Sequence, residues 1–413
     1  MAQNNELTTS CCIAGGGPAG MMLGFLLARA GIDVIVLEKH ADFFRDFRGD
    51  TIHPSTFQLM FELDLLEEFL KVPHQEIETF SAVFNNEPVQ IANFRHLNVV
   101  KPALGLMPQW DFLKFLQKQA ERYPTFRLVM NAEVTGVISG NGRINGVTVS
   151  RADGENRVLA NLVVAADGRR SILREKANLK VISSGVPIDV LWFRVSRLGN
   201  DPAQILGRFN AGRIMVMLDR NDYWQCAYII KKGGDEHIRQ QGIQMFRHDI
   251  ELVAPFLAGR LEEVRSWDDI KLLTVDVDHL ETWYTSGLLC IGDAAHAMSP
   301  VGGVGINLAI QDAVAAANML HKSFKEQGLI EADLLRAVQK RRSFPTRFIQ
   351  QLQILLHNKV IQVHLTDKMN TKPPIFMRLL NAFPILQRLP ARVLGVGVRP
   401  EHIHTPDTAS GTK

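Results

Sequence analysis

The sequence predicts an α/β protein with a Rossmann-like, three-layer domain, an inserted antiparallel β-sheet domain and a helical C-terminal region. Three observations predict this fold. A glycine-rich turn joins the first apolar strand to a helix, two later apolar strands end in Asp-Gly or Gly-Asp, and short strands with turn signals fill the middle third. We place the Rossmann-like domain at 1–75, 96–182 and 276–330, the sheet domain at 76–95 and 183–275, and the helical region at 331–413.

The first strand, helix and second strand form a β-α-β unit that is typical of dinucleotide binding. Its turn carries Gly-x-Gly-x-x-Gly at Gly15, Gly17 and Gly20, and the second strand ends at Glu38. Gly15 permits the tight turn, Gly17 lets the backbone approach a pyrophosphate, and Gly20 lets the helix lie close on the sheet. The helix N-terminus offers N–H groups to phosphates, and the Glu38 carboxylate suits ribose hydroxyls. The candidate contacts in this unit are Gly15, Gly17, Pro18, Ala19, Gly20, Glu38 and Lys39.

Loops, helices and strands alternate in the stretch that follows. A charged loop at 39–51 contains Arg48 and could lie over a bound cofactor, although charge alone favours a solvated surface loop. Hydrophobic periodicity and turn residues predict helices at 54–70 and 109–122, short strands at 76–94, a strand at 126–130, and a hairpin of 133–139 and 144–150 that turns at 140–142.

Two apolar strands then end in acidic motifs. Residues 162–166 run into Asp167-Gly168, and residues 288–291 run into Gly292-Asp293. Strands that are apolar throughout are typical of a buried parallel sheet, and ligands bind at the carboxyl ends of such strands. A glycine-rich turn from Pro300 to Asn307 follows the second motif, and a helix is predicted from Leu308 to about Glu326.

The middle third predicts an antiparallel sheet with strands at 190–198, 204–209, 214–218 and 223–231. Its large apolar side chains could line a pocket, although for each of them a place in the core is the simpler interpretation. Alternation along the strands does not tell which face looks at the dinucleotide domain. The residues concerned are Trp192, Phe193, Phe209, Met215, Met217, Trp224 and Tyr228.

Composition excludes several classes of protein. The formal net charge of +3 gives no indication of a nucleic-acid partner. The four cysteines suggest neither a disulfide framework nor a metal site, and no histidine shows metal-ligand spacing with a second ligand, so no metal is predicted. The first ten residues lack a signal-peptide pattern, and the first apolar stretch is broken by the glycine turn, Arg29 and Asp33. We therefore expect a cytoplasmic protein.

From about Ile330 the chain is helical, amphipathic and basic, and prolines at 345, 373, 374, 384 and 390 are expected to interrupt its helices. A packing helix is the favoured interpretation, and a lid, a dimer surface or a weak membrane contact are the alternatives. The sequence does not predict the oligomeric state.

The three motifs in this order resemble the single-component FAD-dependent aromatic hydroxylases, the para-hydroxybenzoate hydroxylase-like flavoprotein monooxygenases. The resemblance runs from about Cys11 to Leu320. It implies non-covalently bound FAD, with the first motif on its pyrophosphate and adenosine and Asp293 on its ribityl chain. The turn with Pro300, Gly303, Gly305, Ile306 and Asn307 corresponds to the backbone that cradles the isoalloxazine ring. Further contacts implied by the resemblance are Arg48, Gln109, the backbone at Val134, Gly292, and the Asp167-Gly168 motif tied to both FAD and NAD(P)H.

The resemblance implies a monooxygenase. NADPH or NADH would reduce the flavin, and O₂ would then give a C4a-hydroperoxide that hydroxylates a small organic substrate, expected to be aromatic. The cofactor supplies the hard chemistry, so no protein acid or base is required, and we identify no catalytic residue. Two alternatives stay open: a same-fold flavin reductase acting on an isoprenoid or lipid, and a non-catalytic FAD-binding protein. Halogenation is disfavoured because the Trp-x-Trp-x-Ile-Pro stretch of flavin-dependent halogenases is absent.

Two further side-chain interpretations follow. No second Gly-x-Gly-x-x-Gly with the same context is found, so the nicotinamide donor is expected to bind transiently in a surface groove. Arg48, Arg169 and Arg170 are the candidates to meet its phosphates. His296 has no nucleophile motif beside it and is interpreted as a structural residue next to the flavin ring.

Overall fold

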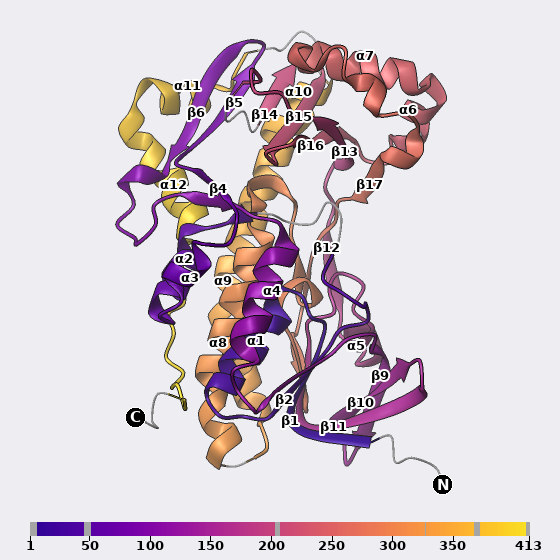
Figure 1. Ribbon diagram of the computed structural model, residues 1–413, viewed down its shortest axis with the longest axis vertical. Helices are drawn as coiled ribbons and strands as arrows, with labels where there is room; N and C mark the ends of the chain where they lie inside the picture. The colour runs from indigo at the N-terminus through magenta and orange to yellow at the C-terminus, as the bar shows by residue number, and fades with distance from the viewer. Residues whose placement is uncertain (1–5, 45–50, 203–206, 327, 367–371, 410–413) are drawn as a thin grey trace.

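The computed structural model describes residues 6–44, 51–202, 207–326, 328–366 and 372–409. Two large β-sheets lie toward opposite ends of an elongated molecule, and two long helices, α8 (Gly305–Glu326) and α9 (Ala332–Leu356), run beside them (Figure 1). The predicted fold class is confirmed. The predicted FAD contact Arg48 lies outside the described residues.

The first sheet has eight strands and is the Rossmann-like sheet that the motifs predict. Five neighbouring strands pair in parallel, in the order β20-β11-β1-β2-β8, and β19 closes one edge in antiparallel pairing with β20. The long strand β11 also pairs with β10 of the antiparallel hairpin β9-β10, because β20 covers only Val163 to Ala165 and leaves the same edge of its first half to β10. The strands are β1 (Glu6–Ala14), β2 (Val34–Leu37), β8 (Phe126–Val129), β9 (Glu133–Gly140), β10 (Arg143–Arg151), β11 (Gly154–Ala165), β19 (Tyr284–Thr285) and β20 (Leu288–Cys290).

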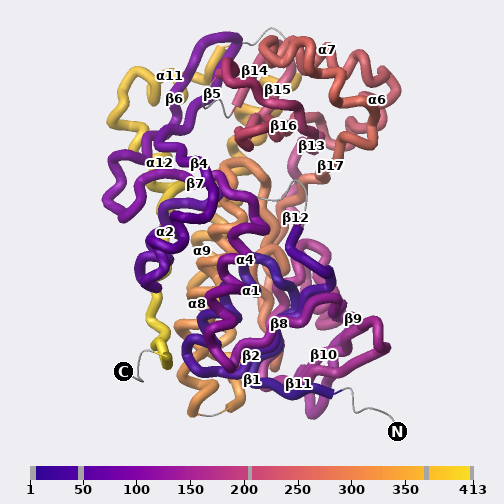
Figure 2. Tube along the Cα trace, in the orientation of Figure 1, coloured from indigo at the N-terminus to yellow at the C-terminus, as the bar shows by residue number. Residues whose placement is uncertain are grey.

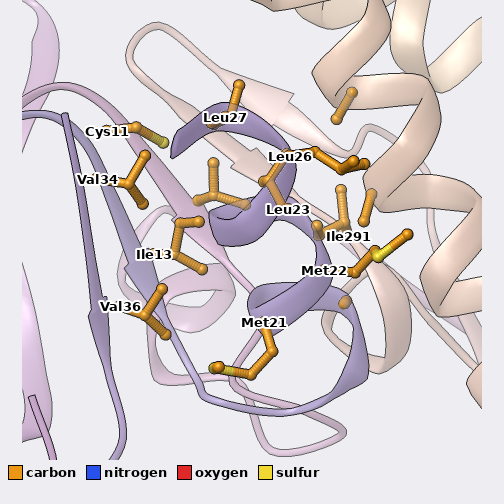
Figure 3. Packing of buried hydrophobic residues seen from close by; sticks show 14 of the residues in the cluster. Cys11, Ile13, Met21, Met22, Leu23, Leu26, Leu27, Val34, Val36 and Ile291 are labelled. Carbon is orange, nitrogen blue, oxygen red and sulfur yellow. The ribbon is translucent and has the colours of Figure 1, made fainter. Parts of the chain in front are cut away.

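Helix α1 (Pro18–Arg29) packs on this sheet along nearly its whole length. Leu23, Leu26 and Leu27 of α1 belong to the same buried cluster as Ile13 and its strand neighbours Val34 and Val36, and Figure 3 shows these residues together. Gly24 brings the helix close, since a Cβ there would lie 2.8 Å from Cγ2 of Val36. α1 also contacts α8 and α4 (Gln109–Ala120), so the glycine turn opens onto a closely packed helical layer.

The second sheet has seven strands in the order β17-β13-β16-β15-β14-β5-β6. All its pairs are antiparallel except β14 with β5, which comes from an earlier part of the chain. Its turns use left-handed residues where the sequence predicts turns, at Ala211, Gly212 and Asn221. The domain boundaries stay a prediction. The strands are β5 (Thr79–Phe84), β6 (Glu87–Asn93), β13 (Ile188–Ser196), β14 (Gly207–Asn210), β15 (Arg213–Asp219), β16 (Tyr223–Lys231) and β17 (Lys271–Thr274).

Helices and two small sheets complete these layers. α6 (Asp235–Gln241) and α7 (Ile243–Val253) cover the outer face of the second sheet, and α5 (Ile172–Lys176) follows the Asp167 motif. One small sheet joins β3 (Thr51–Ile52), β7 (Leu104–Leu106) and β4 (Gln75–Ile77). The other joins β12 (Val181–Ser184), β18 (Val277–Leu280) and β21 (His296–Ala297). Short 3-10 turns occur at Phe94–His96, Pro255–Leu257, Leu261–Glu263, Trp267–Asp269, Gly292–Ala294 and Val301–Gly303.

Two expected helices differ from the sequence prediction. The helix expected at 54–70 is two helices, α2 (Pro54–Glu62) and α3 (Leu66–Phe69), because Asp64 between them has a left-handed φ of 59°. Pro345 was expected to interrupt the C-terminal helices, but it lies buried within α9, and the helix continues past it. A proline removes one backbone hydrogen bond, and the packing of the buried face of α9, to which Pro345 belongs, offsets that loss.

The C-terminal region returns to the Rossmann-like part of the molecule. α9 continues through a π-helical turn (His357–Ile361) into α10 (Gln362–Thr366), followed by α11 (Ile375–Ala382), a 3-10 turn η8 (Pro384–Gln387) and α12 (Arg388–Gly395). The tail after α12 runs back to the C-terminal end of α1, where the Thr408 N–H donates to Arg29 O over 2.9 Å (Figure 2). Among the helices of the described ranges, none is both long enough and apolar enough to span a bilayer.

Candidate functional site

The three glycines of the first motif are needed for different structural reasons. Gly15 has a φ of +105°, and a Cβ on it would overlap the carbonyl oxygen of Ala166. A Cβ on Gly20 would overlap the carbonyl oxygen of Gly15. Gly17 is the N-cap of α1, directly before Pro18, and has no heavy atom within 4 Å of its Cβ position. Packing therefore requires glycine at positions 15 and 20, whereas Gly17 faces open space at the positive end of helix α1.

Glu38 joins the glycine turn to the end of β2. Its Oε2 accepts the Gly16 N–H over 3.0 Å, and its Oε1 accepts the His40 N–H over 3.1 Å. The Ala132 N–H donates to the Glu38 backbone oxygen, so the start of β9 with the predicted contact Val134 follows directly on this corner. Lys39 beside it is exposed.

Gln109 opens α4 near the same loop. It is half-buried, and the ring of its neighbour Trp110 lies 4.9 Å from that of Phe44, which follows the Glu38 corner. The contact places the start of α4 against the 39–44 segment, and the role of Gln109 in cofactor binding stays a prediction.

Asp167 lies at the end of β11 and caps the short helix after it. Its Oδ2 accepts the Ile172 N–H over 2.9 Å, while Ser171 caps the same helix through Arg174. Its Oδ1 is buried and has no hydrogen-bond partner in the described part of the chain. Burial raises the pKa of Asp167, although the hydrogen bonds it accepts oppose this. Gly168, with a φ of +85°, leaves open space beside it.

Asp293 pairs with Arg169, which directly follows the Asp167-Gly168 motif. Arg169 Nε donates to Asp293 Oδ2 over 3.2 Å, and its Nη2 donates to Met298 O over 2.7 Å. The two side chains are about one-third exposed, at 29% and 34%. The prediction that Arg169 and Arg170 meet nicotinamide phosphates stays a prediction; Arg169 joins the Gly-Asp motif, and Arg170 is exposed.

Direct contacts bring the three motifs together. A Cβ on Gly15 would lie 2.9 Å from the backbone nitrogen of Asp167. Gly292, with a φ of +59°, packs so closely that a Cβ would lie 3.1 Å from the Cβ of Ala19 on α1 and 3.2 Å from that of Ala309 on α8. The strand ends β1, β11 and β20 and the N-terminal turns of α1 and α8 therefore meet in one place.

The glycine turn before α8 is held from inside the protein. Gly302 and Gly303 have φ values of 82° and 61°, and a Cβ on Gly303 would lie 2.5 Å from Thr51 Oγ1. The Asn307 side chain accepts the His53 N–H over 2.9 Å and the Thr56 hydroxyl over 2.7 Å. The Asn307 side chain therefore fixes this turn to the fold, and the cofactor contact expected of the turn's backbone stays a prediction.

The other predicted residues of this turn differ in what surrounds them. Gly305, at the start of α8, has no heavy atom within 4 Å of its Cβ position, as at Gly17. Pro300 is half-buried, and Ile306 is buried in the first turn of α8.

Helix α9 holds the same turn from the other side, which sequence reasoning missed. Gln353 accepts the Ser299 N–H over 3.1 Å and donates to the Ser299 and Val301 carbonyls over 2.9 and 2.8 Å. His357 Nε2 lies 2.7 Å from Ser299 Oγ, and burial lowers the pKa of His357 to about 4, so the ring is neutral near pH 7. Polar residues spaced at 350, 353 and 357 on one face of a helix were the available signal.

A buried ionic cluster supports the Gly292-Asp293 motif. Asp312 accepts the Gly292 N–H over 3.1 Å, and it pairs with His296 Nε2 at 2.5 Å and Arg342 Nε at 2.9 Å. Burial would raise the pKa of Asp312, but His296 and Arg342 outweigh it and hold that pKa below its usual range. His296 is 1% exposed, and its ring lies 5.0 Å from that of Trp283, which fits the structural role predicted for it.

The second sheet turns one specific face toward the turn before α8. Trp192 and Phe209 pack in a cluster that also contains Val301. The other apolar residues considered for a pocket belong to the opposite cluster, where they pack against α7: Phe193, Met215, Met217, Trp224 and Tyr228. For these five the core interpretation is confirmed.

These features fit a bound dinucleotide with a polyol chain. Open space beside Gly17 and Gly305 lies at two helix N-termini, where phosphates and an electron-rich ring are favoured. The unpartnered Oδ1 of Asp167 and the part-exposed carboxylate of Asp293 offer acceptors for hydroxyl groups.

Comparisons with known proteins agree with this geometry. The family described as "FAD binding domain" matches residues 8–352. The chain is 29% identical over 356 residues to 6-methylpretetramide 4-monooxygenase of Streptomyces rimosus, covering 84% of this chain and 83% of that protein. It is 27% identical over 327 residues to 3-(3-hydroxy-phenyl)propionate/3-hydroxycinnamic acid hydroxylase 2 of Burkholderia vietnamiensis, covering 76% of this chain and 56% of that protein. The solved structure of OxyS anhydrotetracycline hydroxylase from Streptomyces rimosus has a TM-score of 0.73 at 20% identity, covering 94% of this chain and 76% of that one.

Proposed function

The chain belongs to the FAD binding domain family of flavoprotein oxidoreductases, and from that premise we propose that it uses NAD(P)H and O₂ to hydroxylate an aromatic substrate. The convergence of Gly17, Asp167, Asp293 and Gly305 at one end of the parallel sheet carries this proposal. Relatives over most of the chain are named as monooxygenases or hydroxylases of aromatic compounds, which supports the reaction class.

In this proposal each group binds a different part of FAD. The N–H groups of the first turn of α1 bind the pyrophosphate beside Gly17, and the Glu38 carboxylate, held by the Gly16 N–H, receives the adenosine ribose. Asp293, oriented by Arg169, accepts hydroxyl groups of the ribityl chain. The N-terminus of α8 stabilises negative charge on the pyrimidine end of the ring. When bound, FAD supplies hydride acceptance from NAD(P)H and activation of O₂ at carbon C4a.

The remaining task of the chain is to orient the substrate and exclude water. The sheet face with Trp192 and Phe209 is the proposed wall of the substrate site, because it packs on Val301 in the turn before α8. Apolar walls keep water from the reacting ring, so that reducing equivalents are not lost as peroxide. Arg170 is the proposed surface contact for the phosphates of the donor, since it is exposed beside the Asp167 motif.

We propose a cytoplasmic location, in keeping with four cysteines that are all free and buried as thiols. Burial raises the pKa of Cys12 to about 12, so this thiol stays protonated and unreactive.

Reduction kinetics and product analysis test the function. The purified protein, reconstituted with FAD, is mixed with NADPH or NADH in a stopped-flow instrument, with and without 3-hydroxycinnamate and a panel of phenols and fused-ring aromatics. We expect flavin absorbance near roughly 450 nm, a property of the cofactor. We also expect slow bleaching with the donor alone, faster bleaching with a true substrate, and one labelled oxygen atom in the product under isotopically labelled O₂.

Three results would count against the proposal. Absence of flavin after reconstitution would remove the cofactor assignment. Donor oxidation that saturates an isoprenoid double bond without incorporating oxygen would favour the reductase alternative. No oxidation of either donor with any substrate of the panel would favour a non-catalytic FAD-binding protein.

A further inference from the structure

An exposed apolar surface lies on the C-terminal helices, away from the core. Its members are large side chains of α11, η8, α12 and the residue between α11 and η8, and they are between 45% and 75% exposed: Ile375, Phe376, Leu379, Phe383, Ile385, Leu386 and Leu389. We call these seven residues the C-terminal apolar face. α11 and α12 lie at the outer edge of the molecule, beside strand β6 (Figure 1).

The opposite sides of these helices are fixed to the protein, so the apolar side is turned outward by the fold. In α11, Met377 is buried, and Asn381 accepts the Gln90 N–H of β6 over 3.1 Å. In η8, Gln387 accepts from the Gln90 side chain over 2.7 Å. Ile375 and Leu379 are on the far side of α11, at 75% and 48% exposure, which inverts the usual pattern of a surface helix.

The charged residues of the segment that carries this apolar face are all basic. Between Asp367 and Glu401 the sequence contains no Asp or Glu. Its basic residues are Lys368, Lys372, Arg378, Arg388, Arg392 and Arg399. Arg378, Arg388 and Arg392 are exposed in the same helices that carry the apolar face. Exposed apolar side chains flanked only by cations match the chemistry of an anionic lipid surface.

We propose that the C-terminal apolar face binds the surface of an anionic lipid bilayer. A second copy of the chain fits less well, because a two-fold contact through this face would bring the same arginines of both copies together. An acidic protein partner would need a groove for its own apolar anchors, whereas these side chains project from the outer sides of successive short turns. Each of them can insert separately among lipid acyl chains.

The inner side of the same segment touches the turn before α8. The backbone oxygen of Leu394 lies 2.6 Å from His53 Nδ1, and Leu394 Cδ2 would lie 3.1 Å from a Cβ on Gly302. Helix α12 therefore carries Leu389 of the apolar face on its outer side and contacts the turn before α8 through Leu394. Docking on a bilayer would bring the proposed flavin ring site close to apolar aromatic compounds dissolved in the lipid.

Vesicle co-sedimentation of the FAD-reconstituted full chain tests this inference. The vesicles are phosphatidylcholine alone and phosphatidylcholine mixed with phosphatidylglycerol, at low and high salt. We expect binding to the mixed vesicles that weakens with salt. The double variant Ile385→Ser/Leu389→Ser should lose it, and each arginine replaced, as in Arg378→Gln or Arg388→Gln, should lower partitioning about fivefold. The matched control Met245→Ser/Leu252→Ser removes exposed apolar side chains of α7 and should bind like the wild type.

Each alternative outcome is decisive. No sedimentation of the wild type with mixed vesicles overturns the inference, as does equal loss in the α7 control. A dimer in solution that Ile385→Ser/Leu389→Ser converts to a monomer, without vesicle binding by the wild type, assigns the face to a second copy. FAD content and hydroxylation in detergent-free buffer should be unchanged in the face variants, so a failure here is distinguishable from a failure of the proposed function.

Discussion

At the scale of single residues, the glycines of one motif separate structural from functional requirements. Gly15 and Gly17 are two positions apart and serve the same turn, yet only Gly15 has backbone where a Cβ would have to lie. A spacing rule assigns both to the cofactor. The structure gives Gly15 to the contact between β1 and β11, and it leaves Gly17 free for a ligand.

This difference predicts opposite outcomes for two similar variants. Gly15→Ala should destabilise the fold by about 3 kcal/mol or more, because it combines a forbidden φ with overlap of the Ala166 carbonyl. Gly17→Ala should leave the free energy of unfolding within about 1 kcal/mol of the wild type, since its φ of −75° suits alanine. Its FAD dissociation constant should rise about tenfold or more, because the methyl group takes the space of a phosphate.

Urea unfolding of the FAD-free protein and fluorescence titration with FAD measure the two effects separately. Normal FAD affinity in Gly17→Ala would show that the pyrophosphate does not lie at this turn.

The carboxylate of Asp293 supplies a second prediction at this scale. Asp293→Ala should raise the FAD dissociation constant about tenfold or more, because hydrogen bonds to charged groups contribute about 1.5–3 kcal/mol. The rise should be larger than in Asp167→Ala, because that variant mainly loses the hydrogen bond that caps α5. Arg169→Ala is the control for the partner, because it leaves the carboxylate in place but unoriented. Equal affinity in wild type and Asp293→Ala would refute its placement on the ribityl chain.

At the scale of elements, what the sequence could predict was local. The glycine spacing, the Asn141-Gly142 turn with its two left-handed residues, and the strand-ending acids all follow from neighbours in the chain. The partners of those elements could not be predicted. Arg169 and Asp293 are separated by 124 positions in the sequence, and Ser299 and Gln353 by 54. Local sequence patterns therefore could not predict either contact.

The second sheet makes the same point about faces. Alternation along β13 places Trp192 and Phe193 on opposite faces of the sheet. Which of the two faces the turn before α8 depends on the face that α7 covers. That choice is tertiary, and only the structure supplies it.

The element that supports Gly292-Asp293 predicts a pH-dependent stability. Asp312→Asn should cost about 3–5 kcal/mol, because it breaks the buried ion pairs of Asp312 with Arg342 and His296, and Arg342 then keeps only part of its pairing, through Glu401. The pKa of Asp312 is held below its ordinary 3.8, so the native state keeps the carboxylate ionised where the unfolded chain already binds a proton. Its contribution is complete above that ordinary pKa and is lost as the pH falls through the lower native value.

The difference in unfolding free energy between wild type and Asp312→Asn should therefore be constant near neutral pH and shrink in acid. Urea unfolding across that range measures it. The exposed Asp333 on α9 offers a matched control in Asp333→Asn, which should change stability by less than about 1 kcal/mol at every pH. A constant difference down to strong acid would contradict the ionised state of Asp312.

At the scale of the whole molecule, the last residues hold distant elements together. Glu401 contacts Arg341 at 2.7 Å and Arg342 at 3.2 Å, and its backbone N–H donates to Gln311 of α8. Further along, the Ile403 N–H donates to Glu62 of α2, and Thr408 reaches the end of α1 (Figure 2). The tail thus contacts four helices, α9, α8, α2 and α1, which lie far apart in the sequence.

Glu401→Gln should therefore destabilise the molecule more than it weakens FAD binding. The variant keeps the shape of the side chain but replaces two charge-assisted contacts with neutral ones, at a cost of about 2 kcal/mol. Arg342 retains Asp312, so the loss should be smaller than in Asp312→Asn. The FAD dissociation constant should change less than about threefold, because Glu401 contacts none of the three motifs directly. His404→Ala, at an exposed position of the same tail, is the control and should unfold like the wild type. If Glu401→Gln and His404→Ala had the same unfolding free energy, the tail would be a passive extension that does not hold these helices together.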